Sequence, residues 1–311
     1  MSELKMAPGF SVGHASDEKL RSGVTAILAD APATAGVVVQ GGAPGTRETD
    51  LLNPAKTVQQ VDALVLSGGS AFGLDAASGV QAWLRDNGRG FPVGPHRVPI
   101  VPAAILLDLN PDASWKTYPP YRELGWEACE GATTSPALGS VGAGTGATTG
   151  TAKGGFGMAS TNLPGGVVIT AVVAVSAVGS PYVGSTRNFW AAPFEEEAEF
   201  GGRGYPHPWP LNATEFMLKG SRPRENTTIG AILTNAALDQ AECTQLATMA
   251  HDGFARAIYP AHTPFDGDLI FAASSGQVAA SDALPLLVLG ALAGNTMARA
   301  IARGVFEAEN R

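Results

Sequence analysis

Residues 226–233 read NTTIGAIL, a polar start followed by an apolar run that predicts a buried strand. The preceding stretch, from about Val183 to Glu225, contains glycines, prolines and an acidic run but no apolar periodicity. It is interpreted as a long mobile loop over residues 184–226, because long structureless segments are usually functional or disordered. Where a polar loop enters a strand, chain cleavage is tolerated. The junction of Asn226 and Thr227 is therefore the candidate processing site.

Thr227 is also a candidate nucleophile. A threonine hydroxyl reacts well once a base takes its proton, and a free α-amine on the same residue, with a reference pKa of about 7.7–8.0, is such a base. That amine arises if the Thr227 hydroxyl attacks the Asn226 carbonyl and water then opens the resulting ester. Taken alone, the stretch favours an ordinary polar strand start, since threonine is common in strands.

The rest of the chain predicts a layered mixed α/β fold in a single domain of 311 residues. Short apolar runs predict strands over residues 24–27, 36–39, 63–66, 104–107, 167–178 and 269–273. Apolar spacings of three and four predict helices over about residues 72–84, 239–258 and 282–301. Asp239 can cap the second of these helices, with Glu242 three residues further on.

Composition argues against several classes of function. Hydrophobic residues make up 45% and charged residues 15% of the chain, which allows a large core, and the net charge is -8. No Lys/Arg cluster indicates nucleic-acid binding, and no apolar run of about 18 residues indicates a membrane span. Cys129, Cys243 and the five histidines lack metal-ligand spacing, so no metal site is expected. The N-terminus lacks signal-peptide character, so a cytoplasmic location is expected.

A second stretch with chemical potential is HTPFDGD, residues 262–268, which precedes an apolar run. Asp266 and Asp268 can accept hydrogen bonds from an ammonium and a hydroxyl, and so hold an N-terminal threonine in place. The alternatives are an ordinary Asp-Gly turn, which this stretch alone favours, and a fragment of a calcium loop, which needs more oxygen ligands.

Glycine-rich segments offer backbone N–H groups that can hold an oxyanion. One runs from Gly139 to Ala147, and its candidate oxyanion and pocket residues are Gly142, Gly144, Thr145 and Gly146. Lys153 follows shortly and can stabilise negative charge or tune an amine. A second segment, between a predicted strand and a predicted helix, offers Ser67 and Ser70 to a pocket. Turn formation alone is an alternative explanation for both segments.

Six stretches, taken together and in this order, resemble the L-aminopeptidase/D-amidase-esterase family, which also contains the nylon-oligomer hydrolases. They are GGAPGTRETD (41–50), LSGGSAFGLD (66–75), VGAGTG (141–146), KGG (153–155), NTT (226–228) and DGD (266–268). The likeness spans about residues 9–305, and the joint pattern is highly specific. PFDGD at residues 264–268 and a threonine nucleophile are more similar to the nylon-oligomer hydrolases than to the serine-type aminopeptidases.

The resemblance implies a four-layer αββα sandwich, similar to N-terminal-nucleophile hydrolases but differently connected. It implies self-cleavage into residues 1–226 and 227–311, and no cofactor. By the same resemblance Thr227 is the nucleophile, Lys153 supports catalysis, and Asp266 and Asp268 orient Thr227. Members of this kind are typically homo-oligomeric, so a tetramer of processed heterodimers is expected.

Two positions depart from the family pattern. Ser176 stands where the family usually has an asparagine associated with the oxyanion site, and Ser140 likewise replaces a common asparagine. A serine can still donate one hydrogen bond, but it reaches less far. We expect these changes to affect substrate range and rate rather than the fold.

The sequence therefore predicts a self-processing hydrolase that acts on amide bonds in short peptides or oligoamides through an acyl-enzyme. One alternative is an acyltransferase of the ornithine acetyltransferase type, in which an amine rather than water takes the acyl group. Another is a non-catalytic assembly protein that keeps the fold. The expected partner is a small-molecule or peptide amide substrate, with no nucleic acid and no membrane.

Overall fold

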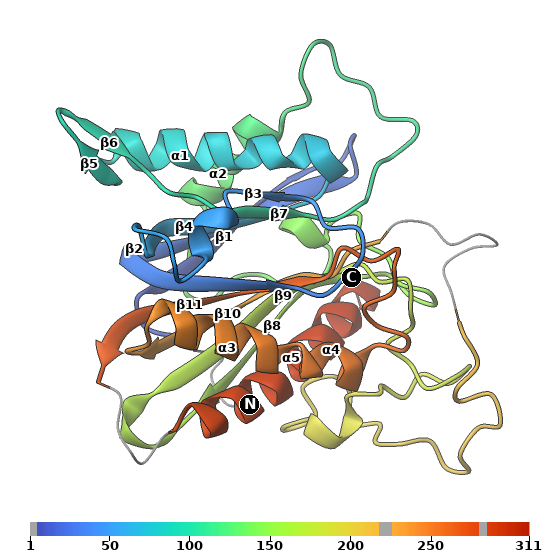
Figure 1. Ribbon diagram of the computed structural model, residues 1–311. Coiled ribbons are helices and arrows are strands. Elements are labelled where there is room, and N and C mark those ends of the chain that lie inside the picture. The colour runs from blue at the N-terminus through green and yellow to red at the C-terminus, as the bar shows by residue number, and fades with distance from the viewer. Residues whose placement is uncertain (1–4, 218–225, 280–284, 311) are drawn as a thin grey trace.

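The computed structural model describes residues 5–217, 226–279 and 285–310, and these form four layers in the order α, β, β, α (Figure 1). One outer layer contains α1 (Ala76–Asp86) and α2 (Tyr121–Glu130). The opposite outer layer contains α3 (Gln240–Ala250), α4 (Asp252–Ala257) and α5 (Leu286–Glu309). The strands lie between the two helical layers, as the predicted αββα architecture requires.

One long strand, β2 (Ser22–Val39), belongs to both β layers. The strand order is β3-β7-β4-β2-β11-β10-β9-β8, with β1 also paired to β2. The first layer contains β1 (Phe10–Asp17), β3 (Thr46–Arg47), β4 (Gln60–Ser67) and β7 (Ala103–Ile105). The second contains β8 (Gly155–Asn162), β9 (Val168–Val175), β10 (Ile229–Ala236) and β11 (Leu269–Val278). A separate exposed hairpin is formed by β5 (Phe91–Val93) and β6 (His96–Val98).

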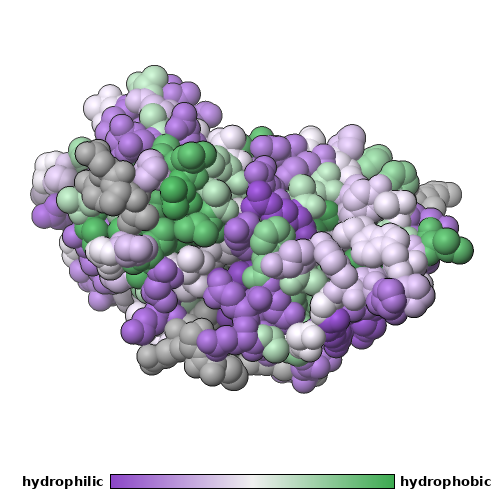
Figure 2. Space-filling view, turned by 90° about the horizontal axis from the view of Figure 1, so that it is seen from below, coloured by the Kyte–Doolittle hydropathy of each residue, from purple (hydrophilic) through white to green (hydrophobic). Residues whose placement is uncertain are grey.

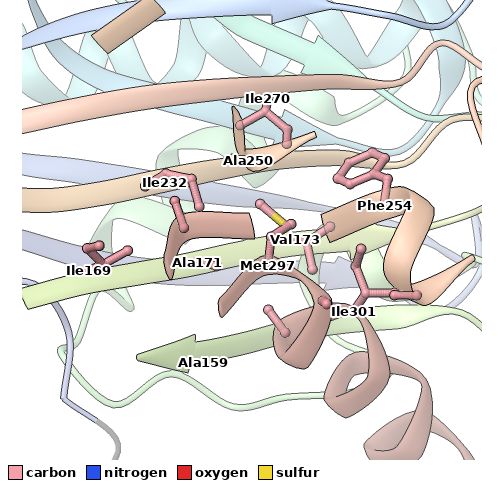
Figure 3. Close-up of a cluster of buried hydrophobic side chains, with 14 of the residues drawn as sticks. Ala159, Ile169, Ala171, Val173, Ile232, Ala250, Phe254, Ile270, Met297 and Ile301 are labelled. Atoms are coloured by element: carbon pink, nitrogen blue, oxygen red, sulfur yellow. The ribbon is translucent and has the colours of Figure 1, made fainter. Parts of the chain in front are cut away.

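Three clusters of buried side chains fill the three interfaces between the layers. Side chains alternate along β10, so Ala231 and Leu233 join the cluster between the two β layers while Ile232 joins the cluster under α3 and α5. Figure 3 shows the cluster under α3 and α5, in which Ile232 lies near Met297 of α5. Both faces of β10 are therefore buried, which explains its unbroken apolar run.

Two elements that the sequence analysis missed, β8 and α2, contain glycines that let a neighbouring backbone pack closely against them. Strand β8 begins with Gly155, in a stretch that was interpreted as turn glycines. A Cβ on Gly157 would lie 1.9 Å from the carbonyl oxygen of Ala300 on α5, so glycine here lets the helix pack directly on the strand. Gly125 has the same function in α2, where a Cβ would lie 2.2 Å from the carbonyl oxygen of Ala76.

The long loop predicted over residues 184–226 contains no strand and no α-helix in its described residues, which are 184–217 and 226. Its first half is anchored to the C-terminal helix α5. Phe200 is buried, and Arg299, which is 4% exposed, binds Glu196 at 2.9 Å and Glu199 at 2.5 Å. These ion pairs join the two pieces that cleavage before Thr227 would separate.

The outer surface is mixed in polarity. Figure 2 shows the molecule from below, with hydrophilic side chains across the centre, a hydrophobic patch on the left and smaller hydrophobic areas on the right. Leu287, at the start of α5, is 71% exposed. Within the described ranges, no helix has both the length and the apolar character needed to cross a bilayer. Association into a homo-oligomer stays a prediction.

Candidate active site

Thr227 lies two residues before β10, where the chain still pairs with the segments next to β9 and β11. This strand runs parallel to β11 and antiparallel to β9. On the β11 side, Asn226 forms a parallel bridge with Asp266. On the β9 side, the Thr227 N–H donates to the carbonyl oxygen of Ser176 at 2.7 Å. The candidate scissile bond is therefore held between two neighbouring chain segments by backbone hydrogen bonds.

The Thr227 hydroxyl points back at the peptide bond that would be cut. Its Oγ1 donates to the Asn226 carbonyl oxygen at 2.5 Å. The Gly267 N–H lies 2.9 Å from the same carbonyl oxygen and 3.2 Å from Thr227 Oγ1. The candidate nucleophile, the Asn226 carbonyl and a fixed N–H donor are thus buried together, since Thr227 is 4% exposed and Asn226 is fully buried.

Gly267 is a site residue that the sequence analysis did not single out. A Cβ at this position would lie 2.7 Å from Thr227 Oγ1 and 2.5 Å from the carbonyl oxygen of Ala43. Gly41 makes a similar close approach from the end of β2, since a Cβ there would lie 2.2 Å from the carbonyl oxygen of Asp266. The GGA start of the stretch at residues 41–50 therefore packs against the DGD segment.

The Asp266 carboxylate is buried and fixes the segment that follows β9. Its Oδ1 accepts the Val178 N–H at 3.1 Å, and its Oδ2 accepts the Thr263 N–H at 3.0 Å and the Thr263 hydroxyl at 2.6 Å. Burial, followed by the nearby charge of Asp268, raises the pKa of Asp266 to about 6. Asp266 is therefore a carboxyl group that can take up a proton close to neutral pH.

This raised pKa predicts a pH-dependent stability in the uncut chain, which is obtained with Thr227→Ala. Because the pKa of Asp266 is higher in the folded state, its contribution to stability is full below about pH 4 and is lost as the pH rises through about 6. Adding Asp266→Asn should remove that loss, which we expect to be about 1–3 kcal/mol. Urea unfolding from pH 4 to 7.5 measures it. Parallel stability curves for the two variants would contradict the assignment.

The second carboxylate, Asp268, holds the residue after the nucleophile. Its Oδ1 accepts the Thr228 N–H at 2.9 Å. Its Oδ2 accepts the His262 N–H at 3.1 Å and lies 2.8 Å from His262 Nδ1. The two aspartates therefore flank the site and fix the segment whose Gly267 N–H contacts the Asn226 carbonyl oxygen. Neither carboxylate is hydrogen-bonded to the Thr227 side chain in the uncut chain, within the described residues.

Ser176 reaches the site through its backbone. Its carbonyl oxygen accepts the Thr227 N–H, but its hydroxyl donates to the Thr148 carbonyl oxygen at 3.2 Å. Lys153 is exposed, and its backbone forms a bridge with Thr148. The Lys153 side chain makes no hydrogen bond or ion pair with any described residue. A catalytic part for either side chain stays a prediction.

The glycine loop from Gly142 to Gly146 is buried or partly buried, and most of its N–H groups already have partners. Gly142 N–H donates to Ser16 Oγ at 2.9 Å, Gly144 N–H to the Val141 carbonyl oxygen at 2.9 Å, and Thr145 N–H to the Gly142 carbonyl oxygen at 3.0 Å. Gly146 packs against the carbonyl oxygen of Arg21. An oxyanion bound by the three bonded N–H groups would have to displace these partners.

Ser67 and Ser70 lie at the end of β4 and the start of the following 3-10 helix. Ser67 is fully buried, and its hydroxyl donates to the Gly68 carbonyl oxygen at 3.0 Å. Ser70 has a left-handed φ of 52°, and its N–H donates to the Leu106 carbonyl oxygen at 2.9 Å. Their backbone groups stabilise the strand-to-helix turn, and a pocket role stays a prediction.

The chain was compared with curated proteins and solved structures. It is 40% identical over 331 residues to an uncharacterized aminopeptidase of Mycobacterium tuberculosis, covering 99% of this chain and 95% of that protein. It is 32% identical over 278 residues to the 6-aminohexanoate-oligomer endohydrolase of a Kocuria species, covering 87% and 74%.

Solved structures with the same fold include an L-aminopeptidase D-Ala-esterase/amidase from Ochrobactrum anthropi, described as a variant of the Ntn hydrolase fold. Its TM-score is 0.67 at 19% identity, with 97% of this chain and 85% of that chain covered. A protein from Pyrococcus horikoshii aligns with a TM-score of 0.70 at 22% identity, with 97% and 86% covered. The family model described as Peptidase family S58 matches residues 6–311. The chain therefore belongs to peptidase family S58 and is a hydrolase of amide bonds.

Proposed function

We propose that this chain cleaves itself between Asn226 and Thr227, and that the freed Thr227 then hydrolyses amide bonds in short peptides or oligoamides. One observation carries the proposal. The Thr227 hydroxyl lies against the Asn226 carbonyl, with an oxygen–oxygen distance of 2.5 Å, and the Gly267 N–H contacts both oxygens. An ordinary strand start does not require this convergence.

The self-cleavage step is an acyl shift. The Thr227 oxygen bonds to the Asn226 carbonyl carbon, the bond from that carbon to the Thr227 nitrogen breaks, and the nitrogen gains the proton that the hydroxyl loses. The Gly267 N–H lies at 2.9 Å from the oxygen on which negative charge develops. Water then hydrolyses the ester, which leaves a carboxylate on Asn226 and a free hydroxyl and amine on Thr227.

The mature reaction uses the same point in space. Thr227 is 4% exposed in the uncut chain, so a substrate gains access when Asn226 withdraws. A substrate carbonyl then takes the place of the Asn226 carbonyl, beside the Gly267 N–H. The Thr227 amine takes the hydroxyl proton, the oxygen forms an ester with the acyl part, and the amine part of the substrate leaves with a proton. Water releases the acid and restores Thr227.

The substrate class follows from the relatives rather than from the site walls. One set of relatives is named for aminopeptidases and another for hydrolysis of 6-aminohexanoate oligomers. Both names describe the hydrolysis of amide bonds. We therefore assign short peptides and oligoamides to this chain. From the family resemblance, we further propose that it acts as a tetramer of processed heterodimers.

Trapping the acyl-enzyme tests this function. Brief incubation with alanine p-nitroanilide or alanine p-nitrophenyl ester, followed by acid quench and peptide mass mapping, should place one alanyl group on Thr227. The linkage should be an ester, so hydroxylamine should remove it. Adding ornithine separates the two reactions: free alanine identifies a hydrolase, and alanyl-ornithine an acyltransferase. An alanyl group on another residue, with turnover intact, would overturn the proposal.

A further inference from the structure

A histidine pair adjoins the candidate site and has no part in the mechanism above. His262 Nδ1 lies 2.8 Å from Asp268 Oδ2, and the other oxygen of Asp268 accepts the N–H of Thr228 at 2.9 Å. The backbone N–H of His262 also donates to Asp268 Oδ2, at 3.1 Å. One residue thus supplies two of the three hydrogen bonds recorded at the Asp268 carboxylate.

The His262 ring is enclosed by aromatic groups of the helical layer. It stacks on Phe254 at a centroid distance of 5.3 Å and meets His251 edge-on at 4.9 Å. His251 Nε2 lies 3.0 Å from the Val38 carbonyl oxygen, so this nitrogen carries the proton. Burial lowers the pKa of His251 to about 4, so the ring is neutral near pH 7.

Neutral His251 leaves an unprotonated Nδ1, and this buried nitrogen has no hydrogen-bond partner among the described residues. The Nε2 of His262 is buried and equally without a partner. Two buried ring nitrogens without a hydrogen-bond partner among the described residues thus belong to rings whose centroids lie 4.9 Å apart. Asp268 lies against His262, and the charges of Asp268 and Asp252 act on His251.

The backbone of His262 adds an independent observation. Its φ is 54°, in the left-handed region, which is uncommon for residues other than glycine although histidine, asparagine and aspartate are enriched there. Strained conformations of this kind persist where the surrounding structure fixes them, and they cluster at functional sites. Here the strain places the His262 N–H and Nδ1 on the same carboxylate oxygen.

We propose that His262 is a positioning residue for the reaction. Its hydrogen bonds hold the Asp268 carboxylate where it accepts the Thr228 N–H, and so hold the strand that carries Thr227. The proposal rests on the proposed function. In the uncut chain Asp268 fixes the N–H of Thr228, the residue after the nucleophile. After cleavage, the same carboxylate keeps the new N-terminus in register with Gly267. His262 acts on the nucleophile through Asp268 and does not touch the substrate.

Two substitutions separate the hydrogen bond from the backbone strain. His262→Gly accepts the left-handed φ but removes the ring. His262→Asn tolerates that φ and places an amide N–H near the position of Nδ1. For processed enzyme with alanine p-nitroanilide, we expect His262→Gly to lower kcat about 10- to 100-fold, as for loss of a hydrogen bond to a charged group. KM should change less than about threefold, and His262→Asn should recover most of kcat.

The split between kcat and KM, together with the rescue by His262→Asn, is a readout that a purely structural part would not give. Unchanged kcat per titrated active site in His262→Gly would overturn the proposal, whatever the thermal stability of the variant. The proposed function fails separately, if Thr227→Ala remains active in the same assay.

Discussion

Thr227→Ala should yield one uncut chain with no amidase activity. The substitution removes the oxygen that lies 2.5 Å from the Asn226 carbonyl oxygen, so the acyl shift has no nucleophile. It also prevents formation of the amine that serves as the base. We expect a loss of at least about 10⁴-fold in kcat/KM, as for removal of a nucleophile that acts with its base as a unit. A denaturing gel and alanine p-nitroanilide hydrolysis measure both effects.

Thr227→Ser is the matched control, because it keeps the hydroxyl and removes a methyl group. It should still cleave itself and retain activity. Thr228→Ala tests the neighbouring hydroxyl, which is buried without a hydrogen-bond partner among the described residues. It should process normally. Cleavage of Thr227→Ala at the same bond would remove Thr227 from the mechanism.

Gly267→Ala should slow self-cleavage about 100-fold while the chain still folds. Its new Cβ would lie 2.7 Å from Thr227 Oγ1 and 2.5 Å from the Ala43 carbonyl oxygen, so the segment has to move. A shift of about 1 Å between a nucleophile and its carbonyl can cost about 100-fold in rate. The N–H that stabilises the developing oxyanion moves with it. Pulse-labelled uncut chain, followed over time, measures the rate.

Gly131→Ala is a suitable control, since a Cβ there has no neighbour closer than 3.7 Å and its φ is -86°. This variant should cleave at the wild-type rate. If Gly267→Ala does so as well, the Gly267 N–H is not the donor that the acyl shift uses.

The elements around the site were predictable where a local pattern determines them. The apolar runs of β10 and β11 are buried on both faces, and each begins directly after the polar residues of its motif. The helix cap was predictable for the same reason: Asp239 accepts the Glu242 N–H at 2.8 Å, and Glu242 accepts the Asp239 N–H at 2.9 Å. Both partners lie within one turn of chain.

Strand β8 and helix α2 were missed because their glycines mark packing rather than turns. Gly157 gives room to the backbone of α5, and Gly125 gives room to α1. The sequence shows that a side chain is absent, but it does not show which distant backbone fills the space. For the same reason the runs at residues 24–27 and 36–39 were interpreted as two strands, although β2 continues through both.

In the candidate site, too, the residues with a local motif were predictable and the contacts between distant residues were not. Its carboxylates and its threonine were recognisable from their motifs. The contact that matters most, between Gly267 and Thr227, joins residues 40 positions apart and depends on the parallel register of β10 and β11. Likewise, the pairing of His262 with Asp268 depends on a left-handed backbone and on the rings of His251, between α3 and α4, and of Phe254 in α4. No local pattern encodes either arrangement.

The central claim is that chain scission creates the catalytic residue, and the intact mass of freshly purified wild-type protein tests it most directly. Two polypeptides, corresponding to residues 1–226 and 227–311, are predicted, and Edman sequencing of the smaller should begin with Thr-Thr-Ile. Amidase activity should rise in step with the smaller polypeptide. A single chain of 311 residues that hydrolyses amides at full rate would contradict the account.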